Sequence, residues 1–122
     1  MRLYEQLILR YYHTPANRGA LKKYDRIFSG ANPFCGDEMM IYIQLDKKKK
    51  IKEIGWEGRG CVISQAAASI FSDSVKGMTL KQAQAIKSDI FLKKLHIDLS
   101  PTRMKCALLA LYTIKNEKSI AI

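Results

Sequence analysis

Four side chains in this sequence could bind a metal ion or react as nucleophiles: the thiols of Cys35, Cys61 and Cys106 and the carboxylate of Asp37. A single glycine separates Cys35 from Asp37, and its backbone freedom could turn both side chains toward one point. Thiolates and a carboxylate can form a tetrahedral shell around Zn²⁺, and thiolates also hold iron–sulfur clusters. The residue types alone leave two readings open, a metal or cluster site and three buried structural cysteines.

All three cysteines lie where secondary-structure elements are expected to meet. Cys35 precedes a predicted strand, Cys61 opens a predicted helix, and Cys106 falls in the first two turns of the last helix. Element junctions bring distant segments together at one end of a layered domain. A helix N-terminus favours a thiolate at Cys61. The charges of Arg103 and Lys105 would favour one at Cys106.

The N-terminal stretch indicates a reducing compartment. The stretch MRLYEQLILRYYHTP is typical of an amphipathic helix and not of a signal peptide. No apolar run approaches the ~20 residues of a membrane span. We therefore expect a cytoplasmic protein, in which an odd number of cysteines argues against a disulfide framework. His13 and His96 adjoin no cysteine and are expected to be ordinary histidines.

The composition is that of a folded, basic protein. Of 122 residues, 48% are hydrophobic, and 21 basic against 11 acidic residues give a net charge of +10. The densest basic cluster, residues 47–50, is interpreted as a solvated hairpin turn. Aromatic residues do not interleave with it as they do in a nucleic-acid stacking platform. Nucleic acid is therefore the less favoured partner, and the basic surface could equally receive an acidic protein.

Alternating hydrophobicity predicts a β-hairpin in the middle of the chain. Met39, Ile41 and Ile43 point to one side of a strand over residues 39–45, and a second strand follows the lysine turn over residues 51–57. A short strand is expected near residues 26–28. These segments predict a small antiparallel sheet with one buried face.

Helical spacing and capping residues predict the other elements. One helix covers about residues 1–13, and a second begins at or next to Cys61 and ends at Gly77. Thr79 caps a third helix, which continues with a break toward residue 95. A Ser-Pro pair begins the last helix. Its buried face is expected to carry Met104, Leu108, Leu111 and Tyr112. The order predicts one α+β domain over residues 1–122, with helices covering one face of a three-stranded antiparallel sheet.

Four stretches of the chain resemble the IscU/SufU/NifU N-terminal family of iron–sulfur cluster assembly proteins, over nearly its whole length. They are YYHTPANRG, NPFCGDEMMIYIQL, GWEGRGCVISQAAASIFSDSVKGMTL and RMKCALLAL. The resemblance implies the same sheet covered by helices. Matched motif by motif, it also implies four metal ligands, which are Cys35, Asp37, Cys61 and Cys106.

Two departures indicate which branch of the family the chain resembles. IscU-type members carry a histidine before the last cysteine and a Leu-Pro-Pro-Val-Lys segment, whereas this chain has Lys105 and HIDLSPTRM. The stretch PTRMKC is similar to the SufU branch, whose members hold zinc and accept sulfur from a SufS-type cysteine desulfurase. The chain lacks the insert that SufU-type proteins usually carry between Cys61 and Cys106, so the middle of the chain resembles the shorter IscU layout.

The nearest resemblance, to SufU, implies a zinc-linked sulfur relay and not a stand-alone enzyme. Cys35 is expected to accept the sulfur because its loop and Gly36 leave it free to swing. Asp37 would tune or release the metal, and Arg103 and Lys105 would balance charge or bind the partner. The sulfur would pass to apo iron–sulfur proteins or to a downstream scaffold.

Two alternatives follow from the same residues. The chain could be a scaffold on which iron and sulfur are assembled as a [2Fe–2S] cluster and passed to apo-proteins. It could also be a structural zinc domain that binds nucleic acid through its basic surface.

Overall fold

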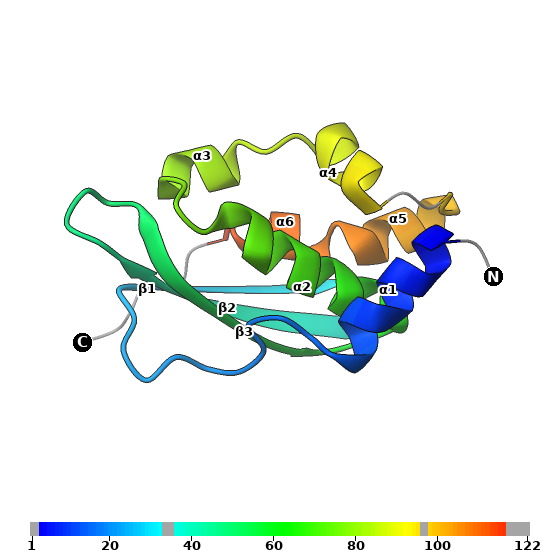
Figure 1. The fold of residues 1–122 in the computed structure, drawn as a ribbon, viewed down its shortest axis with the longest axis horizontal. Coiled ribbons are helices and arrows are strands. Elements are labelled where there is room, and N and C mark those ends of the chain that lie inside the picture. The colour runs from blue at the N-terminus through cyan, green and yellow to red at the C-terminus, as the bar shows by residue number, and fades with distance from the viewer. Residues whose placement is uncertain (1–2, 33–35, 96–97, 117–122) are drawn as a thin grey trace.

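The computed structural model describes residues 3–32, 36–95 and 98–116, which form a three-stranded antiparallel sheet with helices on one face (Figure 1). The strands are β1 (Arg26–Asn32), β2 (Asp37–Leu45) and β3 (Ile51–Arg59), in the spatial order β1-β2-β3. The helices are α1 (Leu3–His13), α2 (Val62–Val75), α3 (Leu80–Gln84), α4 (Ser88–Leu95), α5 (Pro101–Ala107) and α6 (Leu109–Thr113). The predicted α+β class is confirmed. No helix in these ranges is long and apolar enough to cross a membrane.

The core lies between the sheet and the helices. Met39, Ile41 and Ile43 are buried, as their alternation along β2 predicts. α2 packs on β3 while α6 packs on β1 and β2, and Trp56 and Phe71 fill the space at 1% exposure each. Burying a large apolar side chain contributes roughly 1.5–3 kcal/mol. This layer therefore fixes where the ends of the strands lie.

The strands run further than the alternation predicts. β1 has 7 residues and pairs with β2 as far as Asn32 opposite Asp37. Gly30 lies inside it, and a Cβ at this position would strike Thr113 of α6. β3 likewise continues to Arg59. Cross-strand pairing and close helix packing thus override the weak strand propensity of small residues.

Caps confirm the predicted helix starts. The hydroxyl of Thr79 accepts a hydrogen bond from the N–H of Gln82 at 3.2 Å, and the Gln82 side chain accepts one from the N–H of Thr79 at 2.9 Å. The hydroxyl of Ser100 accepts from the N–H of Arg103 at 3.3 Å. Cys61 is the N-cap residue of α2, as its position after the glycines predicts.

The last helix is broken, which its spacing does not predict. Leu108, with φ −93° and ψ 2°, separates α5 from α6. Leu108 and Leu111 are buried as expected, but the prediction is wrong for Met104 and Tyr112, which are 39% and 47% exposed. The break turns α6 about its axis relative to α5. Residues spaced three or four apart across the break therefore do not all face the core.

The segment between α1 and β1 lies along the outer edge of β3. The indole N–H of Trp56 donates to the carbonyl of Ala16 at 2.8 Å. The backbone N–H of Trp56 donates to the carbonyl of Asn17 at 3.1 Å, and the N–H of Gly19 donates to the carbonyl of Trp56 at 2.7 Å. Gly55 leaves room for this segment, since a Cβ there would meet the carbonyl oxygen of Gly19.

A turn of lysines joins β2 to β3, and its conformation is fixed by Asp46. The Asp46 carboxylate accepts hydrogen bonds from the backbone N–H groups of Lys48 and Lys50 at 2.8 and 3.0 Å. These bonds, led by the one from Lys50, lower the pKa of Asp46. Lys49 has φ 66°, a left-handed conformation that costs a non-glycine residue about 1 kcal/mol.

Candidate metal centre

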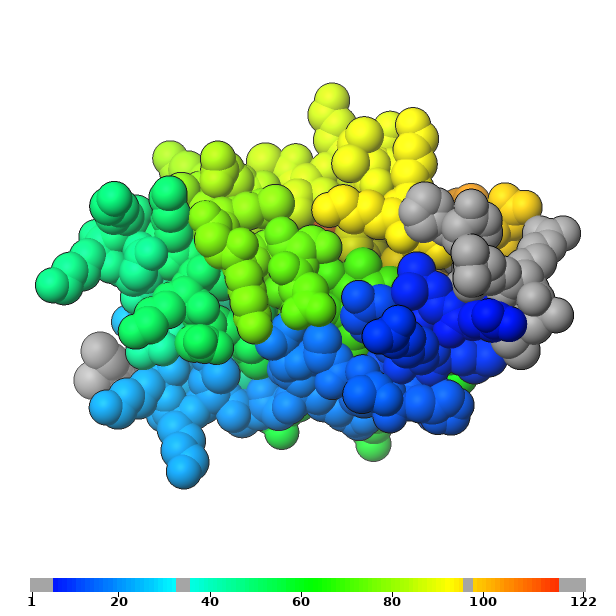
Figure 2. All heavy atoms as spheres, viewed as in Figure 1, coloured from blue at the N-terminus to red at the C-terminus, as the bar shows by residue number. Residues whose placement is uncertain are grey.

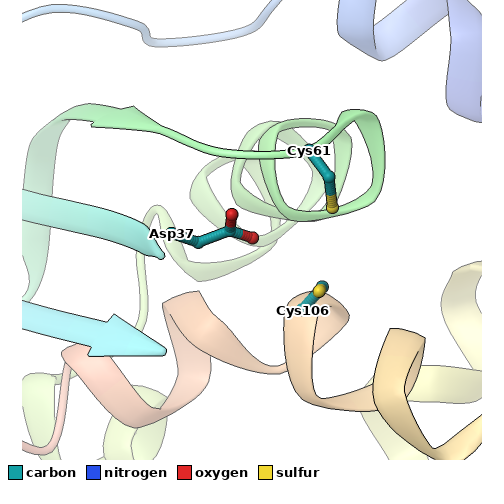
Figure 3. A group of neighbouring side chains, drawn as sticks. All are labelled: Asp37, Cys61 and Cys106. Atoms are coloured by element: carbon teal, nitrogen blue, oxygen red, sulfur yellow. The ribbon is translucent and has the colours of Figure 1, made fainter. Parts of the chain in front are cut away.

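Three of the four predicted ligands meet at one end of the sheet and point toward one another (Figure 3). Asp37 is the first residue of β2, Cys61 lies between β3 and α2, and Cys106 lies in α5. The carboxylate oxygen and the two sulfurs lie within 4.8 Å of one another. The fourth predicted ligand, Cys35, lies outside the described residues.

The three side chains differ in access to solvent. Asp37 and Cys106 are each 3% exposed, whereas Cys61 is half-buried. Among the described residues, Oδ2 of Asp37 has no hydrogen-bond partner. Leaving a buried polar atom without a partner costs roughly 1–3 kcal/mol, and more for a charged group. An unpartnered carboxylate oxygen beside two thiols therefore fits the donor set of a bound Zn²⁺ or iron ion.

Gly60 makes room for the carboxylate. A Cβ on Gly60 would lie 2.5 Å from Cγ and 2.7 Å from Oδ1 of Asp37, and 2.6 Å from the hydroxyl oxygen of Ser64. Real Cβ atoms do not approach other atoms so closely. The space beside this glycine is thus filled by the Asp37 carboxylate.

The start of α2 favours negative charge at the centre. Cys61 has no side-chain capping bond, and the first turn of α2 contains no acidic residue. The backbone N–H groups and the dipole at a helix N-terminus favour negative charge, and no carboxylate in the first turn of α2 offsets this effect at Cys61. The Ser64 hydroxyl donates to the carbonyl of Cys61 at 3.0 Å, and the Cys61 sulfur lies 3.9 Å from the Ser64 hydroxyl oxygen.

Cys61 also borders a cavity of about 570 Å³ that lies beside the centre. Arg103 lines the same cavity, so one of the two predicted charge-balancing residues lies close to the candidate ligands. Lys105 is exposed on the same helix, next to Cys106. The complete lining is Tyr12, Gly60, Cys61, Val62, Ile63, Leu99 and Arg103.

Sequence reasoning did not identify Gly60, Ser64, Tyr12 or Leu99 as parts of this region. The Gly-x-Gly run before Cys61 is the one signal that could have pointed to Gly60, because glycine marks a close approach of another group. Tyr12 and Leu99 carry no such signal, since they join the site through the packing of distant segments.

The orphaned oxygen gives a prediction for Asp37→Asn. After a chelator has removed the metal, the variant is expected to be more stable than the wild type. Its free energy of unfolding should be about 1–3 kcal/mol higher, because the buried charge is removed. Added Zn²⁺ should reverse the order, since the amide is a weaker ligand. Urea unfolding with and without metal measures both. An Asn variant that is less stable than the wild type without metal would contradict this account.

Comparison with known proteins places this geometry in context. The sequence matches the NifU-like N terminal domain family over residues 3–119. It is 32% identical over 115 residues to the "Iron-sulfur cluster assembly scaffold protein IscU" of Haemophilus influenzae, covering 92% of this chain and 90% of that protein. It is 32% identical over 136 residues to the "Zinc-dependent sulfurtransferase SufU" of Bacillus subtilis, covering 98% and 90%.

Longer relatives and a solved structure agree with these matches. The chain is 35% identical over 119 residues to "Iron sulfur cluster assembly protein 1, mitochondrial" of Debaryomyces hansenii, covering 94% of this chain but spanning only 65% of that protein. The crystal structure of the SUF-system protein FiSufU from Fervidobacterium islandicum AW-1 superposes with a TM-score of 0.76 at 25% identity, covering 90% of this chain and 92% of the other.

Proposed function

Since the chain belongs to the NifU-like N-terminal domain family of iron–sulfur cluster assembly proteins, we propose that it receives sulfur from a cysteine desulfurase and relays it onward. The observation that supports this is the meeting of Asp37, Cys61 and Cys106, with one carboxylate oxygen unpartnered. The proposed partner is a SufS-type enzyme, and the recipients are apo iron–sulfur proteins or a downstream scaffold. Residence in the cytoplasm stays a prediction.

The proposed resident metal is zinc, held by Cys35, Asp37, Cys61 and Cys106. When bound, Zn²⁺ would supply a charge that keeps its cysteine ligands deprotonated at neutral pH. Cys61 and Cys106 are anchored by α2 and α5, so their sulfurs stay in place. Asp37 is the hardest ligand of the set and the one most readily displaced by a partner. Arg103 and the start of α2 offset negative charge.

In the proposed relay the thiolate of Cys35 attacks the terminal sulfur of the desulfurase persulfide. The new S–S bond forms on Cys35, the S–S bond of the persulfide breaks, and the desulfurase cysteine leaves as a thiolate. Gly36 has φ 73° and its N–H donates to the carbonyl of Asn32 at 2.9 Å. The described residues on both sides of Cys35 therefore form the closed base of a hairpin loop.

The alternative is a scaffold for a [2Fe–2S] cluster, which would be cargo on the same four residues. It is supported by the similarity to the scaffold protein IscU. Lys105 precedes Cys106 in place of the histidine of IscU-type members, which removes one ligand option but leaves four donors. A structural zinc domain that binds nucleic acid is the third reading.

One preparation separates the three readings. Purified protein is analysed for zinc, iron and acid-labile sulfide, and then added to a cysteine desulfurase with cysteine. Zinc without sulfide, with faster desulfurase turnover, supports the relay. Sulfide with a visible chromophore supports the scaffold. Zinc with no effect on turnover, together with salt-sensitive RNA or DNA binding, would support the structural domain.

The acceptor is tested by Cys35→Ser. The serine hydroxyl is not ionised near neutral pH, so the variant is expected to lose all stimulation of desulfurase turnover. Sulfide release per minute, with and without the variant, measures the effect. Thermal unfolding is measured alongside to show that the variant is folded. Stimulation equal to that of the wild type would show that another thiol accepts the sulfur.

A further inference from the structure

The lysine turn lies at the opposite end of the sheet from the candidate metal centre (Figure 1). Asp37 begins β2 and Cys61 follows β3, while residues 46–50 join the other ends of the same two strands. Each strand has 9 residues, which at ~3.4 Å per residue separates the two ends by about 30 Å. A partner bound at the turn would leave the metal centre accessible.

A second segment brings more lysines to this end. The N–H of Ile51 donates to the carbonyl of Met78 at 2.7 Å, and the N–H of Gly77 donates to the carbonyl of Ile51 at 2.9 Å. These bonds hold the link between α2 and α3 against the turn, and Figure 2 shows the two segments next to each other at this end of the molecule. The lysines on them and Lys81 in the first turn of α3 are all exposed, which gives the set Lys47, Lys48, Lys49, Lys50, Lys76 and Lys81. We call this group the lysine end.

The charges of the lysine end are only partly offset within the chain. Among the residues that the structure describes, none of its six lysines forms an ion pair, and the exposed pair of Arg59 with Glu38 lies at the other end of β3. The Asp46 carboxylate accepts two backbone N–H groups of the turn. It therefore stabilises the turn, and its single negative charge offsets only part of the positive charge of Lys48 and Lys50.

The backbone indicates that Lys49 is not there for folding. It holds φ 66°, which glycine or asparagine adopts at lower cost. Asp46 supplies the bonds that set the turn, so the Lys49 side chain adds nothing to them. A residue kept in a strained conformation that another residue would relieve is a reason to look for a role of its side chain.

We propose that the lysine end is a docking surface for an acidic protein segment. Its charge is complementary to clustered carboxylates, and such complementarity speeds and orients association. All six cations are lysines, whereas phosphate recognition favours the bidentate fork of arginine. Neither segment contains an aromatic residue on which a base could stack. These features favour carboxylates over nucleic acid as the occupant.

A charge-reversal pair tests the surface. The variant Lys47→Glu/Lys48→Glu/Lys49→Glu is compared with Lys87→Glu/Lys93→Glu/Lys94→Glu, which changes net charge equally at exposed positions near and on α4. Binding of a fluorescent oligo-glutamate peptide is measured at low and high salt. The turn variant should bind the peptide at least about tenfold more weakly than the wild type does. The α4 variant should bind it with an affinity close to that of the wild type. Equal loss in both variants would overturn the proposal.

A second variant separates docking from folding. Lys49→Gly should retain or gain thermal stability, because it relieves the left-handed strain, and yet bind the peptide more weakly. Unchanged peptide binding would overturn the role of Lys49. Tighter binding of single- or double-stranded DNA than of the peptide at matched charge would overturn the acidic protein as occupant. Cys106→Ser should leave peptide binding intact, so failure of the relay and failure of this proposal are distinguishable.

Discussion

Cys106→Ser is expected to weaken Zn²⁺ binding by more than about a hundredfold. Cys106 is 3% exposed and its sulfur lies within 4.8 Å of the Cys61 sulfur and an Asp37 oxygen. The serine hydroxyl is not ionised near neutral pH, so the substitution replaces a charged ligand with a neutral one. Loss of a residue that only hydrogen-bonds to a ligand lowers metal affinity by about 10–100-fold. Loss of a ligand itself should lower it by at least as much.

The loss can be read in two ways. Competition with a chromophoric chelator gives the affinity directly. At a Zn²⁺ concentration of about 100 times the wild-type dissociation constant, metal stabilises the fold by about 2.7 kcal/mol, and a hundredfold weaker variant by only about 0.4 kcal/mol. Ala107→Ser is the matched control, since it places a hydroxyl at the neighbouring buried position. Equal zinc affinity of Cys106→Ser and wild type would exclude Cys106 as a ligand.

Gly60→Ala is expected to disrupt the centre without replacing any ligand. The added Cβ would lie 2.5 Å from Cγ of Asp37, so the carboxylate has to move away from the two thiols. We expect a fall in zinc affinity of about 10–100-fold, together with a destabilisation of roughly 1–3 kcal/mol from overpacking. The measurements are chelator competition and urea unfolding.

A double-mutant cycle identifies Asp37 as the cause. In an Asp37→Ala background the carboxylate is gone, so adding Gly60→Ala should change zinc affinity much less than it does in the wild type. The Ser64 hydroxyl also lies near the new Cβ, but it can rotate about its χ1 bond. Additive losses from the two substitutions would show that Gly60 acts independently of Asp37.

Most of the fold could be predicted because local signals agree with the packing. The alternation of Met39, Ile41 and Ile43 gave the buried face of β2, and Thr79 gave the start of α3. The break at Leu108 could not be predicted, since no glycine or proline marks it. Helical spacing therefore predicts Met104 on the buried face, although it is exposed.

The candidate site divides in the same way. Residue chemistry and the resemblance to a family named Asp37, Cys61 and Cys106, because thiols and a carboxylate are recognisable as ligands in any fold. The fit between Gly60 and the Asp37 carboxylate depends on the register of β2 against β3. Such a fit between two strands is not visible in the sequence of either one.

The segment bonded to Trp56 has a consequence for self-association. An unpaired strand edge can recruit a strand of another molecule and begin a fibril. Asn17 and Gly19 occupy the backbone groups of Trp56 at the middle of the β3 edge. Strand addition is therefore blocked where this segment lies along the middle of the β3 edge, and the sheet cannot grow from there into a polymer.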